Sequence, residues 1–160
     1  MRIGVLSDTH IMNGRGLPSS VWETLVGVDL ILHAGDLTSV EFLADLMTLA
    51  PVRAVKGNCD GWDIQLPERD IVVCDGVRIG LIHGHGGARG STPERAYKAF
   101  AHESVQGIVF GHSHSPYLAR ENGILLFNPG SPTLKRREPQ YSFGLFEILR
   151  GEIEARHYYF

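Results

Sequence analysis

Short strand-like runs, each ending in a polar segment, limit the possible folds of this chain more than any other feature. Runs at residues 2–6, 28–33 and 52–56 contain the Val, Ile and Leu that are typical of buried strands. The segments between them, residues 18–26 and 38–49, have the pattern of helices. Strands that alternate with helices predict a layered α/β fold in which these strands run parallel.

The second half of the chain is richer in antiparallel strands. Glycine-containing turns join pairs of strand-like runs and predict hairpins at residues 70–82, 117–127 and 141–159. A helix at residues 91–103 and a strand at residues 108–110 are predicted between the first two hairpins. Together the two halves predict sheets that mix parallel and antiparallel strands.

Length and composition predict one domain, residues 1–160. A net charge of −3 does not indicate a general nucleic-acid surface. No apolar run is long enough to cross a bilayer, and the chain reaches Ser7-Asp8 too soon for a signal peptide. Two cysteines, Cys59 and Cys74, are too few for a disulfide framework, so we expect a cytoplasmic protein.

A pair of histidines, His112 and His114, directly follows the apolar run at residues 108–110. In an extended chain, residues two apart point to the same side, with Cα atoms roughly 6.5 Å apart. Imidazole is the commonest metal-binding side chain, so this spacing indicates a metal site. Asp8 and His10 repeat the spacing after the first strand.

Other strands also end in potential metal ligands. Across five strand ends the sequence supplies seven such donors: Asp8, His10, Asp36, Asn58, His83, His112 and His114. Because ligands in an α/β sheet bind outside the carboxyl ends of its strands, we expect these side chains to lie together. Each also has an ordinary structural interpretation, such as a helix cap for Asp36, a turn for Gly57-Asn58, or a capping Asp8 beside a surface His10. His33, within a strand, is interpreted as a core histidine or a support for the ligands.

Nitrogen and oxygen donors without a required thiolate suit Mn, Fe, Co, Ni or Zn in a reactive site better than a sulfur-bound structural zinc. Seven donors exceed the needs of one tetrahedral ion and suit two adjacent ions, between which Asp36 can bridge. Two ions roughly 3.5–4 Å apart favour phosphoryl chemistry.

The order of these motifs resembles that of the calcineurin-like metallophosphoesterase superfamily. The matching segments are Asp8-Thr9-His10, Gly35-Asp36, Gly57-Asn58-Cys59-Asp60, His83-Gly84 and Gly111-His112-Ser113-His114. The short chain, the Gly-Asn-Cys-Asp variant and Asn128-Pro129-Gly130-Ser131 are similar to the small prokaryotic phosphodiesterase branch.

The resemblance implies a four-layer α-β-β-α sandwich of two mixed sheets flanked by helices. It also implies two divalent ions, with manganese as the expected metal. One ion would take Asp8, His10, Asp36 and His114 as ligands. The other would take Asp36, Asn58, His83 and His112. A hydroxide that bridges the ions would attack the phosphorus of a small phosphate ester in line.

Cys59 departs from the family pattern, because many relatives carry a histidine there that is thought to protonate the leaving oxygen. A thiol with an ordinary pKa of about 8.5 is a poorer acid at neutral pH than an imidazolium. His85 is the other candidate acid, with a structural turn role as the alternative. Asp60 is expected to support the ligands, and with Asn58 it completes the predicted catalytic group.

Cationic side chains near these motifs are candidates for gripping a second phosphate or a diester arm. They are Arg89, Lys135, Arg136 and Arg137. For the last three, a solvated charge run is the ordinary alternative.

A phosphodiesterase is the function that the sequence favours. A phosphomonoesterase or a nucleotide pyrophosphohydrolase is the alternative, since the motifs do not separate these activities. An alternative of another class is an interaction scaffold, similar to a eukaryotic retromer subunit with a degraded metal site. The seven filled ligand positions favour the enzyme. The expected partner is a small phosphate ester, and a homo-oligomer remains open.

Overall fold

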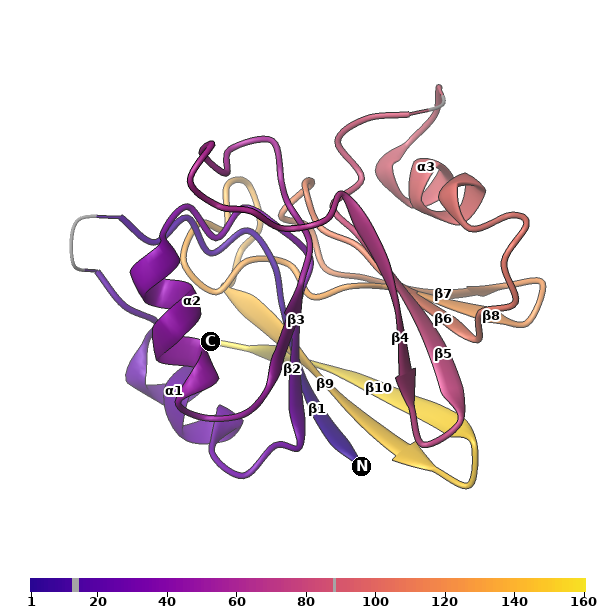
Figure 1. Cartoon of the computed structure of the whole chain (residues 1–160), viewed down its shortest axis with the longest axis horizontal. Helices are drawn as coiled ribbons and strands as arrows, with labels where there is room; N and C mark the ends of the chain where they lie inside the picture. The colour runs from indigo at the N-terminus through magenta and orange to yellow at the C-terminus, as the bar shows by residue number, and fades with distance from the viewer. Residues whose placement is uncertain (13–14, 88) are drawn as a thin grey trace.

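The computed structural model describes residues 1–12, 15–87 and 89–160. Two five-stranded sheets face each other between helices (Figure 1), so the predicted four-layer α-β-β-α sandwich is confirmed. The first sheet has the order β10-β9-β1-β2-β3, with β1 Arg2–Leu6, β2 Leu30–His33, β3 Val52–Ala54, β9 Ser142–Leu149 and β10 Glu152–Tyr159. The second has the order β4-β5-β6-β8-β7, with β4 Arg69–Cys74, β5 Val77–Ile82, β6 Gly107–Val109, β7 Tyr117–Glu121 and β8 Ile124–Asn128.

Both sheets are mixed, as the sequence predicts. β1, β2 and β3 pair in parallel, whereas β9 pairs antiparallel with β1. In the second sheet β5, β6 and β8 run parallel, and β4 and β7 close its edges antiparallel. The loops that leave β1, β2, β3, β5 and β6 gather at one end of the sandwich, the upper end in Figure 1.

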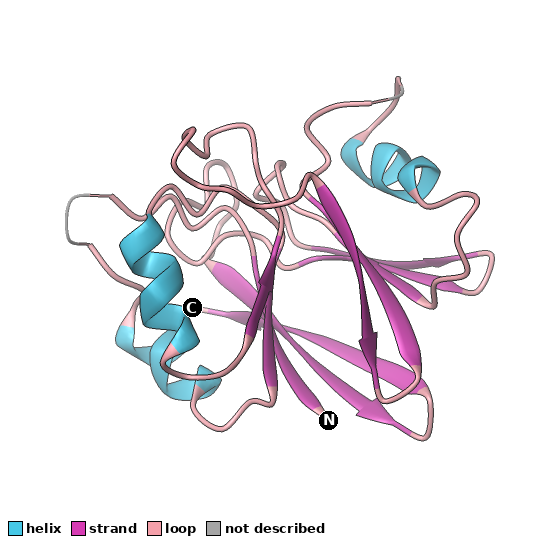
Figure 2. Ribbon diagram, viewed as in Figure 1, coloured by secondary structure: helices cyan, strands magenta, loops and turns pink. Residues whose placement is uncertain are grey.

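The helices cover the outer faces of the two sheets (Figure 2). Helices α1 Ser19–Leu25 and α2 Val40–Met47 lie on the first sheet, where Val21 and Phe42 pack into an apolar cluster with Ile31. Helix α3 Thr92–Ala99 lies on the second sheet through Phe100, just beyond its end. A Cβ atom at Gly80 would lie 2.9 Å from the Phe100 ring, so β5 carries a glycine at this crossing.

A third apolar cluster fills the space between the sheets. Its side chains alternate along strands of both sheets, among them Val5, Leu81, Phe127 and Phe146. The rings of Phe127 and Phe146 meet edge to face, with centroids 4.9 Å apart. This interior fixes the two sheets relative to each other and thereby fixes the loops at their carboxyl ends.

Serine side chains cap two of the helices. Ser39 Oγ accepts a hydrogen bond from the backbone N–H of Phe42, and Ser91 forms a capping box with Glu94. Asp36 is therefore not the cap of α2, which removes the ordinary interpretation of that residue. The helix α3 ends at Ala99 rather than near residue 103, and residues 100–102 continue as turns.

Candidate metal centre

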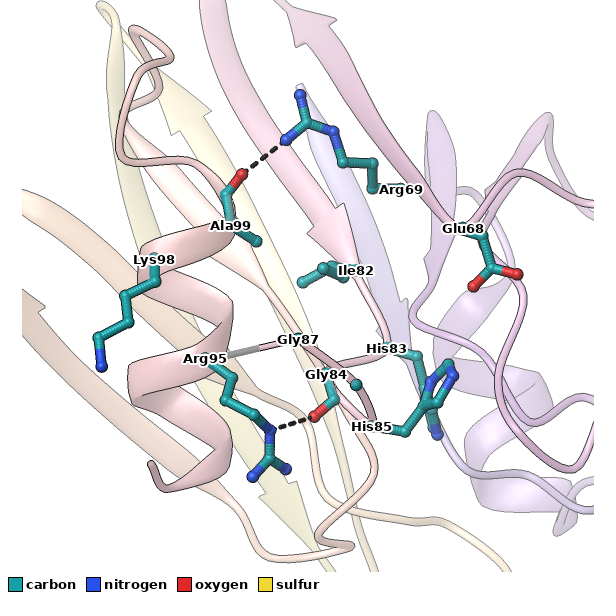
Figure 3. Close-up of a pocket in the computed structure, with 11 residues that line it drawn as sticks. Glu68, Arg69, Ile82, His83, Gly84, His85, Gly87, Arg95, Lys98 and Ala99 are labelled. Atoms are coloured by element: carbon teal, nitrogen blue, oxygen red, sulfur yellow. Dashed lines mark hydrogen bonds between the residues drawn. The ribbon is translucent and has the colours of Figure 1, made fainter. Parts of the chain in front are cut away.

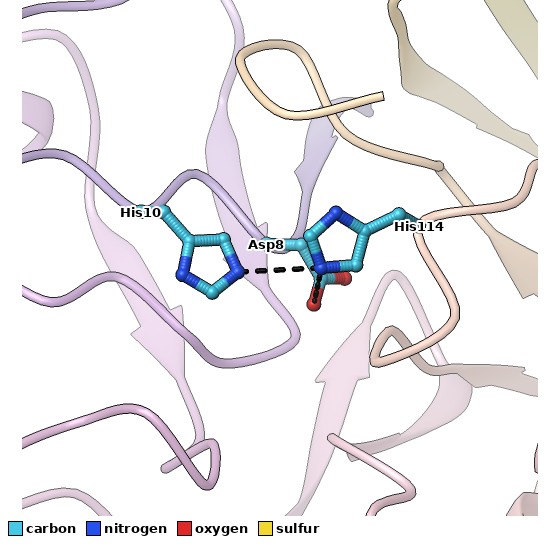
Figure 4. A group of neighbouring side chains, drawn as sticks. All are labelled: Asp8, His10 and His114. Carbon is cyan, nitrogen blue, oxygen red and sulfur yellow. Dashed lines mark hydrogen bonds and ion pairs between the residues drawn. The ribbon is translucent and has the colours of Figure 1, made fainter. Parts of the chain in front are cut away.

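All seven predicted donors lie at the end of the sandwich where the loops gather. The first group comprises Asp8, His10 and His114 (Figure 4). His114 Nε2 lies 3.3 Å from Asp8 Oδ1 and 3.3 Å from His10 Nε2. These three residues come from the loops after β1 and β6, one strand from each sheet.

Asp36 joins this first group to a second. Its Oδ2 atom lies 3.6 Å from His10 Nε2 and 3.3 Å from His83 Nε2. Asn58 Oδ1 lies 3.1 Å from His83 Nε2 and 3.1 Å from His112 Nδ1. The seven side chains therefore form one continuous set of contacts with Asp36 at its middle.

The extended geometry expected for the two histidine-containing pairs is wrong. Asp8, His10, His112 and His114 have φ angles of 54°, 43°, 67° and 62°, in the left-handed region. Left-handed turns after the strands send His112 to Asn58 and His114 to Asp8, instead of placing both imidazoles side by side. Such conformations cost about 1–3 kcal/mol each in non-glycine residues and are typical of functional sites.

The hydrogen bonds of two histidine rings indicate that a cation fits this centre. The Nδ1 atoms of His83 and His114 donate to the carbonyl oxygens of Ala34 and Leu134. The Nε2 atom of each ring faces a carboxylate oxygen, and in His114, whose pKa is lowered, that atom presents a lone pair to Asp8 Oδ1. A divalent ion would replace this repulsion with two bonds, and a backbone carbonyl on the other nitrogen is the usual support of a metal-binding histidine.

Burial dominates the electrostatics of the centre. It raises the pKa of Asp8 to about 6 and lowers the pKa of His114 to about 4. Burial lowers the pKa of His83, but the hydrogen bond with Asp36 and the charge of Asp8 outweigh it, so this pKa is raised. The raised pKa values of Asp8 and His83 both indicate that added positive charge is favourable in this centre, and a metal ion would supply it.

Asp60 holds the ligand loops together through backbone hydrogen bonds. Its carboxylate accepts hydrogen bonds from the backbone N–H groups of Gly57, Asp36 and Thr38, at 2.7, 2.9 and 2.8 Å. The loops after β2 and β3 are thus tied together through one buried carboxylate. A Cβ atom at residue 57 would collide with Asp36 Oδ1, so glycine is required there.

Cys59 lies at the mouth of the centre. Its backbone N–H donates to Asp36 Oδ1 at 2.7 Å, and its thiol lies in a group with ligand atoms of His10 and Asp36 that are all within 4.8 Å. The thiol is exposed. Partial burial and the charge of Asp36 raise the pKa of Cys59, so the thiol keeps its proton at neutral pH.

His85 is exposed at the edge of a neighbouring cavity of about 320 Å³ (Figure 3). The centroid of its ring lies 5.4 Å from that of His83 and 6.3 Å from that of His112. Arg95 lines the same cavity and donates to the carbonyl oxygens of Gly84 and Gly90, which braces the loop that carries His85.

The other candidate cations have different surroundings. Arg136 Nη1 donates to the carbonyl oxygen of His112, so this member of the basic run lies at the centre. Lys135 Nζ donates to the carbonyl oxygen of Glu138. Arg89 and Arg137 are exposed. Of these four cationic residues, Arg136 contacts a predicted ligand residue, His112, in the described parts of the chain.

His33 supports the centre from the core, which agrees with its interpretation from the sequence. Gly35 N–H donates to its Nδ1 atom at 3.2 Å, and its Nε2 atom lies 3.0 Å from Thr9 Oγ1. Burial lowers the pKa of His33 to about 3, so the ring is neutral.

Sequence reasoning missed the residues that hold the ligand loops from the end of β8 and from the segment just after it. Ser131 Oγ donates to the carbonyl oxygen of Asp8 at 2.8 Å, and Asn128 Nδ2 donates to that of Gly111 at 2.9 Å. The signal was the Asn128-Pro129-Gly130-Ser131 motif, which the sequence showed but to which no role was assigned.

Two mixed sheets between helices, with carboxylate, imidazole and amide donors at the strand ends, define a class of metal-binding α/β sandwich suited to hydrolytic chemistry. The calcineurin-like phosphoesterase superfamily domain matches residues 1–151, and the chain belongs to this superfamily. The resemblance drawn from the motifs is therefore confirmed.

Relatives carry names that agree with this assignment. A probable metallophosphoesterase of Methanothermobacter thermautotrophicus is 41% identical over 138 residues, 85% of this chain and 80% of the relative. A phosphodiesterase of Methanocaldococcus jannaschii is 29% identical over 146 residues, 81% of this chain and 83% of the relative. The crystal structure of Vps29 from Entamoeba histolytica complexed with Zn²⁺ is 25% identical, covers 99% of each chain and has a TM-score of 0.79. No helix in the described part of the chain is long and apolar enough to cross a membrane.

Proposed function

We propose that this protein, as one domain of residues 1–160, is a phosphodiesterase that uses two divalent metal ions. One observation carries the proposal: all seven donors are present and in contact, with the Asp36 carboxylate between the two groups. The preference for diesters is supported by the relative that is named a phosphodiesterase.

Asp8, His10, Asp36 and His114 would hold one ion, and Asp36, Asn58, His83 and His112 the other. Two such ions, with manganese as the expected metal, bind phosphate oxygens and lower the pKa of water. Asp60 and Ser131 keep the ligand loops in position through backbone hydrogen bonds. The carbonyl contacts of His83 and His114 keep their Nε2 atoms directed into the centre.

Proton transfer to the leaving oxygen falls to the exposed groups at the mouth. Cys59 and His85 are the two exposed side chains there that we propose as candidate proton donors. Because the thiol keeps its proton tightly, we propose that esters with good leaving groups are preferred. A monoesterase or a nucleotide pyrophosphohydrolase would use the same centre and differ in what the surrounding cavities accept.

An interaction scaffold is a second candidate, because solved structures of Vps29 share this fold. The complete and connected donor set favours the enzyme. Cytoplasmic location stays a prediction from the sequence.

The test is hydrolysis of a panel of phosphate mono- and diesters by protein loaded separately with Mn²⁺, Ni²⁺, Co²⁺ and Zn²⁺. We expect diester hydrolysis that depends on metal and falls by about 100-fold or more in Asp36→Asn. Asp45→Asn is the matched control, because Asp45 is exposed on α2, away from the centre. Metal-loaded parent protein with no esterase activity would support the scaffold instead.

A further inference from the structure

A second cavity, of about 470 Å³, lies beside the first group of ligands. His10, a predicted metal ligand, is among the residues that line it, so the cavity borders the metal centre. Its apolar wall includes Ile11, Leu134, Tyr141 and Phe160. Leu134 and Phe160 are 44% and 37% exposed, so both side chains are accessible to a ligand.

The aromatic part of this wall is fixed by the sheet. Tyr141 and Phe160 extend the β9–β10 pair through two backbone hydrogen bonds, of 3.0 and 3.2 Å. Their rings stack with centroids 5.8 Å apart and planes 26° apart. Phe143 meets Phe160 edge to face at 6.2 Å. The cavity therefore presents a preformed aromatic surface, and binding there does not require these side chains to become ordered.

The same wall is tied to the metal ligands. The carbonyl oxygen of Leu134 accepts the hydrogen bond from His114 Nδ1, while the Leu134 side chain lines the cavity. Ser131 Oγ donates to the carbonyl oxygen of Asp8 and accepts from the Leu134 N–H at 2.8 Å. One short segment thus positions both a ligand and the cavity wall, so the distance between them is fixed.

We propose that this cavity binds a flat aromatic ring on one organic arm of the phosphate ester; this inference rests on the proposed function and names the substrate class. The described residues that line the cavity include no acidic side chain, and Arg15 is among them. Aromatic and aliphatic walls without a carboxylate accept a flat ring attached to an anionic phosphate.

The cavity beside His83 and His85 differs in its lining, which includes Glu68, Arg69 and Lys98 (Figure 3). The two cavities border different ligands, His10 in one and His83 in the other. A phosphate at the metal centre can therefore direct one arm into each cavity. This arrangement suits a diester with two unlike arms, one of them aromatic.

The test uses phosphonates, which carry one organic arm on a carbon–phosphorus bond that is not hydrolysed. Calorimetry with Zn²⁺-loaded protein compares phenylphosphonate with cyclohexylphosphonate, of similar size but not flat, and with methylphosphonate. We expect phenylphosphonate to bind about five- to tenfold more tightly than cyclohexylphosphonate. Tyr141→Leu should remove this preference and leave methylphosphonate binding unchanged, because leucine keeps the wall apolar without the ring.

Tyr159→Leu is the matched control, since Tyr159 is an aromatic residue of β10 that is 52% exposed and does not line the cavity. It should keep the preference for the phenyl probe. Thermal unfolding is measured to check that both variants are folded. Tyr141→Phe should keep the preference for the phenyl probe that Tyr141→Leu loses. Equal affinities for phenyl- and cyclohexylphosphonate in the parent, or an undiminished preference in Tyr141→Leu, would overturn the inference alone. If none of the three probes binds, the proposed phosphate site is wrong and this inference falls with it.

Discussion

His114 Nε2 lies 3.3 Å from Asp8 Oδ1, and both side chains are completely buried. Because His114 donates its Nδ1 proton to the carbonyl oxygen of Leu134, a lone pair faces the carboxylate. Two buried acceptors in contact repel each other unless a proton or a cation lies between them. The fold thus holds this centre in a conformation that a metal ion would stabilise.

Metal binding should therefore stabilise the fold. Mn²⁺ at about 100 times its dissociation constant contributes about 2.7 kcal/mol to the free energy of unfolding. For a chain of this size, that corresponds to a rise of about 5–10 °C in the unfolding temperature. We expect calorimetry to show this rise, EDTA to reverse it, and His114→Ala to lose most of it. Elemental analysis should find two ions per chain, and a single closed site would contradict the proposal.

Metal affinity should fall as the pH drops through 6. Burial raises the pKa of Asp8 to about 6, above its ordinary value of 3.8, so the folded metal-free protein holds a proton there that a metal ion must displace. This proton stabilises the metal-free fold below pH 3.8 and its contribution is lost as the pH rises through 6. The stabilisation by metal should therefore shrink on acidification. Titration calorimetry at pH 5, 6 and 7, in buffers of different ionisation enthalpy, measures the released protons; affinity independent of pH over this range would exclude Asp8 as a ligand.

Replacing His112 with Ala should cost activity much more than stability. The His112 side chain is partly exposed in a loop beyond β6, and its ring contacts Asn58. We expect diester hydrolysis to fall by about 100-fold or more, with a change in unfolding free energy within about 1 kcal/mol. Activity and thermal unfolding are measured under saturating metal. Parental activity in this variant would show that His112 is not a ligand.

Asp60→Ala, in contrast to His112→Ala, should lower the stability of the fold strongly. Three backbone N–H groups would lose a buried carboxylate acceptor, and hydrogen bonds to charged groups contribute about 1.5–3 kcal/mol each. We expect a loss of about 3 kcal/mol or more in the free energy of unfolding, along with weaker metal binding as Asp36 moves. Chemical unfolding curves measure the loss. The neighbouring exposed residue Asp63 supplies the control, since Asp63→Ala should change stability little; equal effects of both substitutions would contradict a supporting role for Asp60.

The sequence predicted the strands, the helices and the gathering of polar strand ends, because hydrophobic periodicity and strand direction are local properties. It could not predict how each ligand enters the centre. The left-handed conformations of His10 and His112 arise from contacts between loops far apart in the chain, and no residue pattern marks them. The backbone carbonyl of Leu134 was equally invisible, since any residue type supplies a carbonyl. Family resemblance supplied the ligand assignment, and the structure adds the hydrogen bonds that orient two of the ligands.

Cys59→His tests how the leaving oxygen is protonated. The Cys59 thiol is exposed beside Asp36, and its pKa is raised by partial burial and by that carboxylate, which makes it a weak acid. The parent should therefore hydrolyse aryl diesters much faster than alkyl diesters, whose basic leaving groups need a proton. An imidazolium at this position should reduce the ratio of aryl to alkyl kcat/KM by about tenfold or more. The ratio of aryl to alkyl kcat/KM is measured for the parent and for Cys59→His, and the metal content of each preparation is checked.

Cys59→Ser separates this role from a structural one. Serine keeps the size and the backbone N–H that donates to Asp36 Oδ1, but its hydroxyl is a still weaker acid than the thiol. If the thiol donates the proton, Cys59→Ser should lose activity on alkyl diesters and keep it on aryl diesters. The alternative is that Cys59 only helps to position Asn58, whose Nδ2 atom lies 3.4 Å from the Cys59 sulfur. In that case Cys59→Ser should be harmless. Cys59→His should then impair metal binding without any gain in activity on alkyl diesters. An unchanged aryl-to-alkyl ratio in fully metallated Cys59→His would assign the proton donor elsewhere. His85 would be the next residue to replace, because the centroid of its exposed ring lies 5.4 Å from that of His83 and 6.3 Å from that of His112.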